Sequence, residues 1–423
     1  MNPSTRCLRA RYVFPVAGRP MADATVAFQA GRIVAVGGNP AAGPIENLGN
    51  AAILPGLVNA HVHLDLSDVP APLGHPGVGI VDFIRSVMAH RRQRAPGRPS
   101  AVAQGLRESL RLGTTMLGDI AQPGWRVEDL RNCPCETTLF LELIAPRIEQ
   151  VAAATDLARQ HLMGLGATAG LPSSAFHLRP GLSPHAPYTV HAELLRQAVA
   201  LSATNRVPLA FHLAESPEEM ELLRTGGGPL AALLQSLDKW DPTAMAPAAG
   251  AIGYLRTLAR AHRALVIHGN YLGDEEIGFL AAHRQNMAVV YCPRSHAWFG
   301  HKPYPLARLL AAGATVALGT DSRASVPDLS LLAEMRLAAR THASVRPETI
   351  VELGTLGGAR ALGLQDQLGS LEPGKWANLV VVALPEHHAA DPHELLLDSE
   401  CPVLRTYFRG QEPVPSPSGR GLG

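Results

Sequence analysis

The sequence contains little lysine, few cysteines and no long apolar run. Its five cysteines are an odd number and lack the spacing of a disulfide framework, so we expect reduced thiols and a cytoplasmic location. No apolar run approaches the ~20 residues that a membrane-spanning helix requires. Residues 1–20 also lack the uninterrupted apolar core of a signal peptide. These absences predict a protein without a membrane partner.

A strong charge of either sign is also missing. Among the 423 residues, 37 Lys and Arg oppose 36 Asp and Glu, which gives a net charge of +1. Such a balance predicts no basic surface for nucleic acid or for an anionic membrane. The 46% of hydrophobic residues instead suits a soluble enzyme with a large core and a small-molecule substrate. Whether the chain forms a homodimer is left open.

Both ends of the chain have strand character. Near the start, residues 24–28 and 32–36 flank a short turn, and near the end, residues 374–382 and 403–408 repeat the pattern. The simplest packing joins them in one small β-sandwich domain built from residues 1–51 and 369–412. The segment 413–423 is rich in Pro, Gly and Ser and is expected to be a disordered tail.

The middle of the chain alternates short apolar runs with helical patterns, such as those of 216–224 and 329–343. Runs buried on both faces that alternate with helices indicate a parallel sheet. Eight such units predict an α/β fold, a distorted (β/α)8 barrel of the TIM type over residues 52–368, with its largest insertion at 225–256. The runs are 52–60, 114–120, 138–144, 176–182, 207–213, 264–267, 287–291 and 315–318.

Polar residues able to bind metal or move protons end four of these runs. In such barrels the active site lies at the carboxyl ends of the strands. A chain with 18 histidines is expected to contain a His-x-His triplet by chance, so His61 and His63 mean little alone. Alternate residues of a strand share a face, however, and His212 and Asp321 end other runs. Three imidazoles and a carboxylate predict one divalent metal ion, Zn²⁺ or Fe²⁺, in an open catalytic site where bound water is activated.

Two further residues are candidates for proton transfer. Glu215 follows His212 by three residues and can reach both the water and a substrate nitrogen; otherwise it is an ordinary glutamate at the start of the helix that Ser216 opens. His268 ends the sixth run. It is a fifth ligand, a donor that polarises the bound water, or a histidine satisfied within the core.

Five motifs give the chain a resemblance to a known superfamily: PGLVNAHVHL (55–64), SPHAPYT (183–189), HLAE (212–215), CPRS (292–295) and LGTDS (318–322). Together they resemble the amidohydrolases, in particular the cytosine, guanine and S-adenosylhomocysteine deaminases and the chlorohydrolases. The resemblance covers nearly the whole chain, including a return to the sandwich at 369–379. It implies that His61, His63, His212 and Asp321 are metal ligands, and that Glu215, His268 and Asp321 are catalytic. It also implies that His185 hydrogen-bonds the substrate. Ser295 is a further candidate for substrate binding.

The scarce lysines bear on the number of metals. Binuclear members of the superfamily bridge two metals with a carboxylated lysine. The three lysines here lie in the insertion, after the seventh run and in the sandwich: Lys239, Lys302 and Lys375. The chain is therefore expected to hold a single metal ion.

The stretch after the first run, with the segment 292–300, is most similar to the aminodeoxyfutalosine deaminases of menaquinone biosynthesis. Those usually carry a glutamate where Asp65 stands. The resemblance implies hydrolytic deamination of an aminopurine-type nucleoside, with metal-bound hydroxide attacking the amino-bearing ring carbon. Another aminopurine nucleoside or a guanine-like base stays open as the substrate. So does a different hydrolysis, by a cyclic amidase or a triazine-type chlorohydrolase, and so does a binding protein without catalysis.

Other substrate contacts have two readings each. Arg147 either pairs with a substrate carboxylate or lies on the surface. The aromatic rings of Phe83, Trp298 and Phe299 either stack on a purine or pack in the core. Trp240 either covers the pocket or anchors the insertion.

Overall fold

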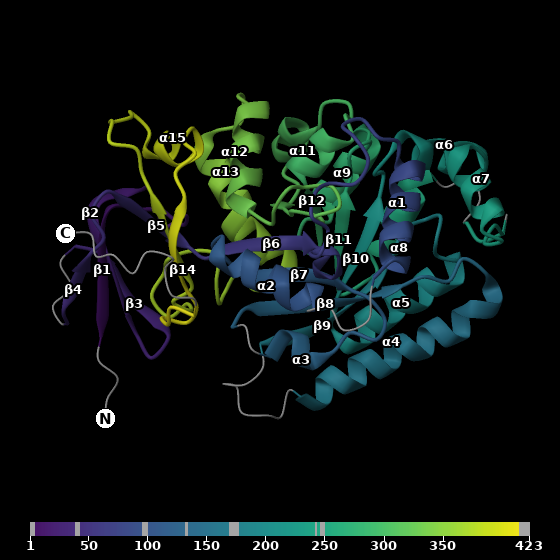
Figure 1. Ribbon diagram of the computed structural model, residues 1–423, viewed down its shortest axis with the longest axis horizontal. Helices are drawn as coiled ribbons and strands as arrows, with labels where there is room; N and C mark the ends of the chain where they lie inside the picture. The colour runs from purple at the N-terminus through teal and green to yellow at the C-terminus, as the bar shows by residue number, and fades with distance from the viewer. Residues whose placement is uncertain are drawn as a thin grey trace.

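Two β-sheets of different kinds organise the chain (Figure 1). The computed structural model describes residues 5–38, 43–94, 100–131, 134–168, 177–241, 243–245 and 250–413. Apart from Pro413, the expected tail 413–423 lies outside these residues, as does Phe176 at the start of the fourth run. One sheet contains the strands of the middle of the chain, and the other contains strands from both ends.

The eight strands of the middle form a parallel sheet in sequence order. It curls into a barrel, because an isolated parallel bridge joins Val62 to Asp321 and both Thr320 and Asp321 donate backbone hydrogen bonds to the carbonyl of His61. This closure confirms the distorted (β/α)8 barrel. The strands are β6 (Leu57–Val62), β7 (Thr114–Ala121), β8 (Glu136–Leu143), β9 (Leu178–Pro184), β10 (Pro208–Leu213), β11 (Arg263–His268), β12 (Met287–Tyr291) and β13 (Val316–Leu318).

The first apolar run, 52–60, is not one strand as predicted. It divides at Gly56 into β5 (Ala51–Pro55), which belongs to the end sheet, and β6, which starts the barrel. A side chain at Gly56 would collide with Thr115, since a Cβ there would lie 2.2 Å from its Oγ1. Continuous burial of both strands hides the change of sheet from a reading based on hydrophobicity.

The end sheet joins the first and last parts of the chain, as the sequence predicts. Its centre is β5, which pairs in parallel with β1 and antiparallel with β14. The predicted hairpin of 24–28 and 32–36 is the antiparallel pair of β2 and β3. The strands besides β5 are β1 (Arg6–Val13), β2 (Met21–Gln29), β3 (Arg32–Gly37), β4 (Ile45–Asn47), β14 (Leu379–Ala383) and β15 (Val403–Tyr407).

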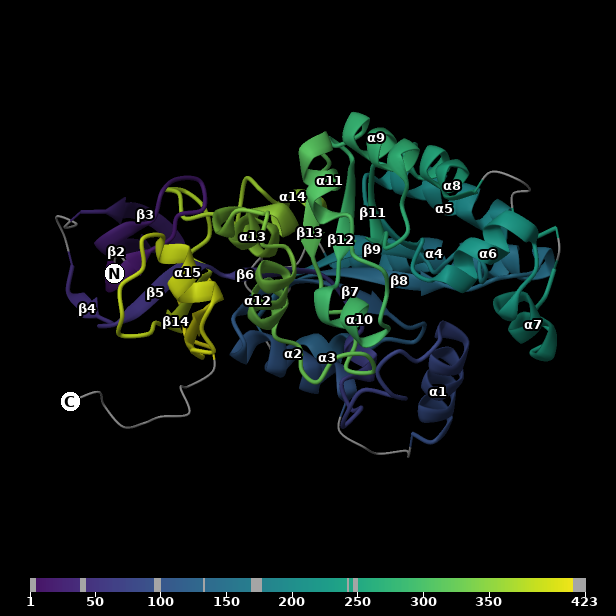
Figure 2. The same ribbon diagram turned by 90° about the horizontal axis from the view of Figure 1, so that it is seen from above.

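Helices surround the barrel strands in both ribbon views (Figures 1 and 2). The two helices predicted from local pattern are α6 and α12, which begin after the capping side chains of Ser216 and Ser330. None of the described helices is both long and apolar enough to cross a membrane. The helices are α1 (Ile80–Arg92), α2 (Ala101–Arg111), α3 (Val127–Arg131), α4 (Ile148–Thr168), α5 (Ala192–Asn205), α6 (Pro217–Thr225), α7 (Pro229–Ser236), α8 (Gly250–Leu258), α9 (Asp274–Ala282), α10 (Pro293–Trp298), α11 (Leu306–Ala312), α12 (Leu331–Thr341), α13 (Pro347–Glu352), α14 (Gly358–Leu362) and α15 (Pro392–Leu397), with short turns η1 (Leu64–Leu66) and η2 (Leu353–Gly357).

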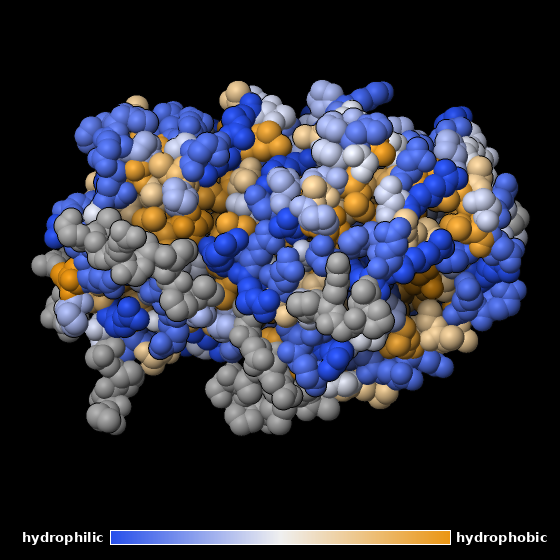
Figure 3. All heavy atoms as spheres, viewed as in Figure 1, coloured by the Kyte–Doolittle hydropathy of each residue, from blue (hydrophilic) through white to orange (hydrophobic). Residues whose placement is uncertain are grey.

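The insertion 225–256 contains α7, and α8 begins within it. Figure 2 shows α7 beside α1, at the end of the molecule away from the end sheet. Trp240 is half-buried and packs into a cluster that includes Tyr188 and Phe299. This contact favours the anchoring role for Trp240. On the face drawn in Figure 3, hydrophilic side chains predominate and hydrophobic ones are scattered among them.

The inside of the barrel shows which strand positions point inward. Alternate residues of a strand share a face, so an inward residue near the middle of a strand predicts the orientation of the one two places later. On β8 the inward position is Phe140. Gly181 of β9 leaves room for its ring, because a Cβ at Gly181 would lie 2.5 Å from the ring. The strand residues of this inner cluster are Val58, Ala60, Met116, Ile120, Phe140, Ala210, Leu265, Ile267, Ala288, Val290 and Ala317.

Candidate active site

His61 and His63 lie at the carboxyl end of β6, where the pairing of β6 with β7 is irregular. Both imidazoles are buried, and their Nε2 atoms lie 3.6 and 3.8 Å from Oδ1 of Asp321. Asn59 holds this end of the strand in place: its side-chain oxygen accepts from the amides of His61 and Thr320, at 3.3 and 3.2 Å. The irregular strand end thus directs both imidazoles toward one carboxylate.

His212 ends β10 and turns one nitrogen toward the same group. Its Nδ1 lies 3.0 Å from the carbonyl oxygen of His185 and therefore donates a proton to it, which leaves Nε2 as the atom with a lone pair. The ring centroid of His212 is 5.0 Å from that of His61 and 5.4 Å from that of His268. Backbone contact with the neighbouring strand thus selects the tautomer that a metal ligand needs.

Three residues at this end of the barrel have left-handed backbone conformations: Ala214, His268 and Asp321, with φ of 56°, 67° and 59°. Such conformations are costly for residues other than glycine and persist where surrounding contacts impose them. At His268 one such contact is the hydroxyl of Tyr304, which donates to its carbonyl over 3.0 Å. The site residues His268, at the end of β11, and Asp321, after β13, are therefore both carried on strained backbone.

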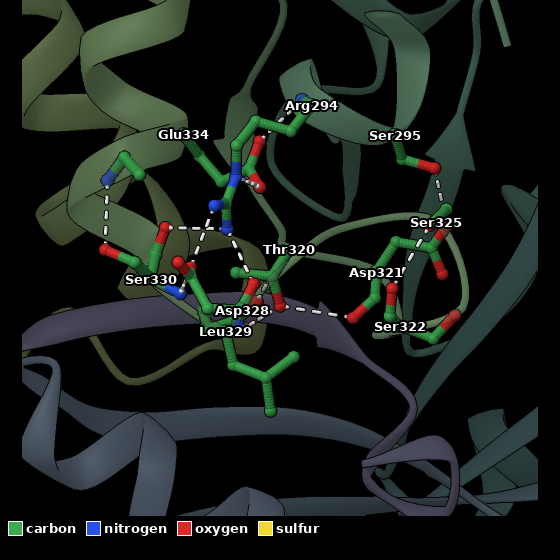
Figure 4. Close-up of polar contacts among 12 residues, drawn as sticks. Arg294, Ser295, Thr320, Asp321, Ser322, Ser325, Asp328, Leu329, Ser330 and Glu334 are labelled. Carbon is green, nitrogen blue, oxygen red and sulfur yellow. Dashed lines mark hydrogen bonds and ion pairs between the residues drawn. The ribbon is translucent and has the colours of Figure 1, made fainter. Parts of the chain in front are cut away.

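Asp321 is oriented by two serines. Ser295 and Ser325 both donate to its Oδ2, over 2.7 and 3.0 Å (Figure 4). Oδ1 is thus left to face the imidazoles of His61 and His63. Ser295 is held in turn through its neighbour Arg294, whose guanidinium Nε donates to buried Glu334 over 2.6 Å. Ser295 therefore contacts the carboxylate of Asp321, while its contact with the substrate stays a prediction.

Burial sets the protonation of the cluster. It lowers the pKa of His212 well below its ordinary value and that of His268 to about 3, so both imidazoles are neutral near pH 7. Burial by itself raises the pKa of Asp321, but its contact with His61 and its electrostatic interaction with His268 outweigh burial and lower the pKa below its usual range. Neutral imidazoles beside an ionised carboxylate are the protonation states of metal ligands.

Glu215 follows the strained residue Ala214, and its Oε1 lies 3.6 Å from Nε2 of His268. The carboxylate of Glu219 accepts from the amides of Ala214 and Glu215, both over 2.8 Å, and Asn270 donates to the carbonyl of Glu215 over 2.8 Å. Burial raises the pKa of Glu215 well above its ordinary value. A carboxyl held this way is suited to exchanging protons with a bound molecule.

The donor set fits a divalent metal ion. Two trios share His61, namely His61–His212–His268 and His61–His63–Asp321, and the candidate ligand atoms within each trio lie within 4.8 Å of one another. Both ring nitrogens of His61 are buried and without a hydrogen-bond partner. Buried polar atoms without partners are rare and call for a missing ligand.

The predicted substrate residues are placed differently from one another. The ring centroid of His185 is 4.9 Å from that of His212, and its Nδ1 pairs with Thr189 over 2.7 Å. Phe83 packs edge-on against Phe299, with centroids 4.9 Å apart. Arg147 pairs with the exposed Asp238 of the insertion over 2.8 Å.

Four polar residues that the sequence analysis did not select lie near these groups. Gln122 and Glu142 follow the inward positions of β7 and β8 by two residues. Asp65 lies in η1, just after β6, and pairs with Arg91 near the end of α1. A glutamate inside the apolar run 138–144 was the available signal for Glu142.

The model of the amidohydrolase family matches residues 52–412. Aminodeoxyfutalosine deaminase of Deinococcus radiodurans is 32% identical over 339 residues, 75% of each chain. A 5-methylthioadenosine/S-adenosylhomocysteine deaminase of Moorella thermoacetica is 29% identical over 416 residues, 90% of this chain and 86% of the relative.

Two solved structures share the fold. Aminofutalosine deaminase of Helicobacter pylori has a TM-score of 0.81 at 23% identity, covering 96% of this chain and 99% of that chain. An adenosine deaminase from Xanthomonas campestris with bound zinc has a TM-score of 0.72 at 26% identity, covering 97% of this chain and 93% of that chain. The family match spans most of the chain and confirms the resemblance carried by the motifs. This chain belongs to the amidohydrolase family.

Proposed function

We propose that the chain is a metal-dependent hydrolytic deaminase of an adenosine-type nucleoside. The observation that carries the proposal is the buried cluster of four histidines and Asp321 with Glu215 beside it. Relatives named as deaminases of aminodeoxyfutalosine and of 5-methylthioadenosine/S-adenosylhomocysteine support the reaction class.

His61, His63, His212 and Asp321 would hold one divalent metal ion, Zn²⁺ or Fe²⁺, with His268 beside it. Such an ion, when bound, lowers the pKa of water toward neutrality and so supplies a nucleophile. A zinc-bound relative of the same fold and the imidazole-rich donor set favour zinc. A single ion is proposed because none of the three lysines lies on a barrel strand, where it could bridge two metals: Lys239 follows α7, Lys302 follows α10, and Lys375 is paired with Glu372.

Glu215 would carry protons in both directions. It would take a proton from the attacking water and deliver it to the ring nitrogen. It would then pass the proton of the newly formed hydroxyl group to the amino group, so that ammonia leaves as the carbon–oxygen bond becomes a carbonyl. His268 and Asp321 would hold the water by hydrogen bonds while it attacks the amino-bearing carbon. His185, adjacent to His212, would donate or accept a hydrogen bond at the purine ring.

Among adenosine-type substrates we favour 6-aminodeoxyfutalosine, which would place the enzyme in menaquinone biosynthesis in the cytoplasm. The support is the 32% identity to the Deinococcus radiodurans relative. Triazine hydrolases share the fold at 20–21% identity, so a chlorohydrolase of the same architecture is the second candidate.

A substrate screen tests the proposal. The zinc-loaded protein is offered adenosine, 5′-methylthioadenosine, S-adenosylhomocysteine, 6-aminodeoxyfutalosine, guanine and atrazine, with release of ammonia and chloride measured. We expect ammonia from at least one of the nucleosides and none from a metal-free sample. Chloride release alone, or no ammonia from any nucleoside, would overturn the deaminase assignment.

A further inference from the structure

The side of the barrel mouth formed by β7, β8 and β9 carries buried polar groups that the proposed mechanism does not use. On β7 and β8 the inward residues are Ile120 and Phe140, so Gln122 and Glu142, two places later, face the mouth. Glu142 is only 3% exposed. A buried carboxylate requires hydrogen-bond or charged partners, so the contacts of Glu142 indicate its role.

Glu142 has one neutral partner that leaves part of its bonding capacity unused. Gln122 donates to its Oε2 over 2.7 Å. Glu142 is directly paired in register with Ser183 of β9, whose buried hydroxyl has no hydrogen-bond partner. His185 lies two residues beyond Ser183, and its amide donates to the carbonyl of Leu143, the residue after Glu142, over 3.1 Å. Glu142 is therefore next to the histidine that flanks the metal cluster.

A second buried carboxylate lies in the same region. Arg91 of α1 donates to Oδ2 of Asp65 through Nε and Nη2, over 3.2 and 3.0 Å, while Oδ1 is buried without a partner. Asp65 and Gln122, the hydrogen-bond partner of Glu142, line the same cavity. The carboxylates of Asp65 and Glu142 both retain acceptor capacity.

We propose that Glu142, supported by Gln122 and Asp65, is the subsite for the vicinal hydroxyl groups of a ribose. The inference rests on the proposed function, because it names which part of the nucleoside this half of the mouth receives. A carboxylate accepts two hydroxyl donors at once, and hydrogen bonds to a charged acceptor are stronger than neutral ones. Two neighbouring carboxylates repel an anionic group, so a substrate carboxylate would be directed away from Glu142.

The competing explanation gives Glu142 a purely structural role. In that case its charge would stabilise the barrel through Gln122, and its removal would weaken folding without regard to the substrate's hydroxyls. The two explanations differ in one quantity, the preference of the enzyme for a riboside over the same nucleoside without hydroxyls.

The experiment compares kcat/KM for adenosine and 2′,3′-dideoxyadenosine, or for the best nucleoside of the screen and its dideoxy form. The proteins are the zinc-loaded wild type, Glu142→Gln and the matched control Glu149→Gln, whose carboxylate is exposed at the start of α4. We expect the wild type and the control to prefer the riboside by about 10- to 100-fold, the range for a hydrogen bond to a charged group. Glu142→Gln should lose most of this preference while keeping its zinc content.

Two results would overturn the subsite. The first is a wild type that deaminates both nucleosides equally well, which needs no variant to fold. The second is a Glu142→Gln enzyme with lower activity but an unchanged riboside preference, which would assign Glu142 to structure. A wild type that releases ammonia from no nucleoside is a different failure, since it would overturn the deaminase itself.

Discussion

The two halves of the barrel mouth are built differently. β6, β10, β11 and the segment after β13 present the groups that fit a metal: four histidines and Asp321. β7, β8 and β9 present an amide, a carboxylate and the flanking histidine: Gln122, Glu142 and His185. The separation by strand suggests that the first half performs the chemistry and the second recognises the substrate.

Backbone strain follows the same division. Three residues of the metal half have positive φ: Ala214, His268 and Asp321. In the other half, Gln122, Glu142 and His185 all have negative φ. β8 and β9 pair in register from Thr137 to Leu143, so Glu142 lies within a regular strand. Ligand atoms must converge on one point, but the side chains of a regular strand point to alternate faces. Strained backbone at the strand ends turns the ligand side chains toward that point.

Removing Asp321 should have the largest effect, because its Oδ1 faces the imidazoles of His61 and His63. We expect Asp321→Ala to lose both its metal and its activity, as shown by elemental analysis and ammonia release on the folded protein. A variant that retains a full complement of zinc would contradict the ligand assignment. Two tightly bound ions per active wild-type chain would contradict the single-metal site.

Glu215→Gln should leave the metal in place and slow the chemical step. Glutamine keeps the size and hydrogen bonding of the side chain but cannot carry a proton. We therefore expect normal zinc content and a kcat lower by about 10²–10⁴, with a smaller change in KM. Near-normal kcat at full zinc content would transfer the proton route to His268 or Asp321.

The metal half could be predicted from the sequence because each of its residues ends an apolar run. His212, His268 and Asp321 mark points where a buried strand stops, and a parallel barrel gathers such points at one end. Their convergence follows from topology, so no knowledge of side-chain contacts was needed. The strained backbone that completes the geometry leaves no mark in residue type, since Ala214 and His268 are ordinary residues in sequence.

The recognition half was largely missed for the same physical reason. Gln122 and Glu142 become visible only when the inward period of β7 and β8 is known, and that depends on packing inside the barrel. Arg147 was selected for its position just beyond a strand, but the insertion supplies Asp238 as its partner. Gly56 likewise has a role only because Thr115 of another strand lies against it.

The serines behind Asp321 should have an intermediate effect. Ser295→Ala and Ser325→Ala each remove one hydrogen bond from Oδ2 and leave the ligand atom Oδ1 in place. Loss of a group that orients a metal ligand typically weakens metal affinity by 10- to 100-fold, roughly, and we expect this range for each variant. Titration with a zinc chelator measures it. Unchanged affinity in the double variant would mean that the strained backbone alone orients Asp321.

The smallest effect is expected at Arg147, which lies on the surface around the mouth and belongs to neither half of it. Its guanidinium pairs with Asp238, whose side chain is 92% exposed. Exposed ion pairs contribute about 0–1 kcal/mol, because water and salt screen both charges. We therefore expect Arg147→Ala to keep the wild-type kcat/KM and nearly the wild-type melting temperature. Arg91→Ala is the informative partner, since it removes the guanidinium that pairs with the buried carboxylate of Asp65, two residues from His63. If Arg91→Ala lowers kcat/KM and Arg147→Ala does not, the guanidinium that matters to the substrate is on α1. A loss confined to Arg147→Ala would instead extend the recognition half to the insertion and require Asp238 to release the arginine when substrate binds.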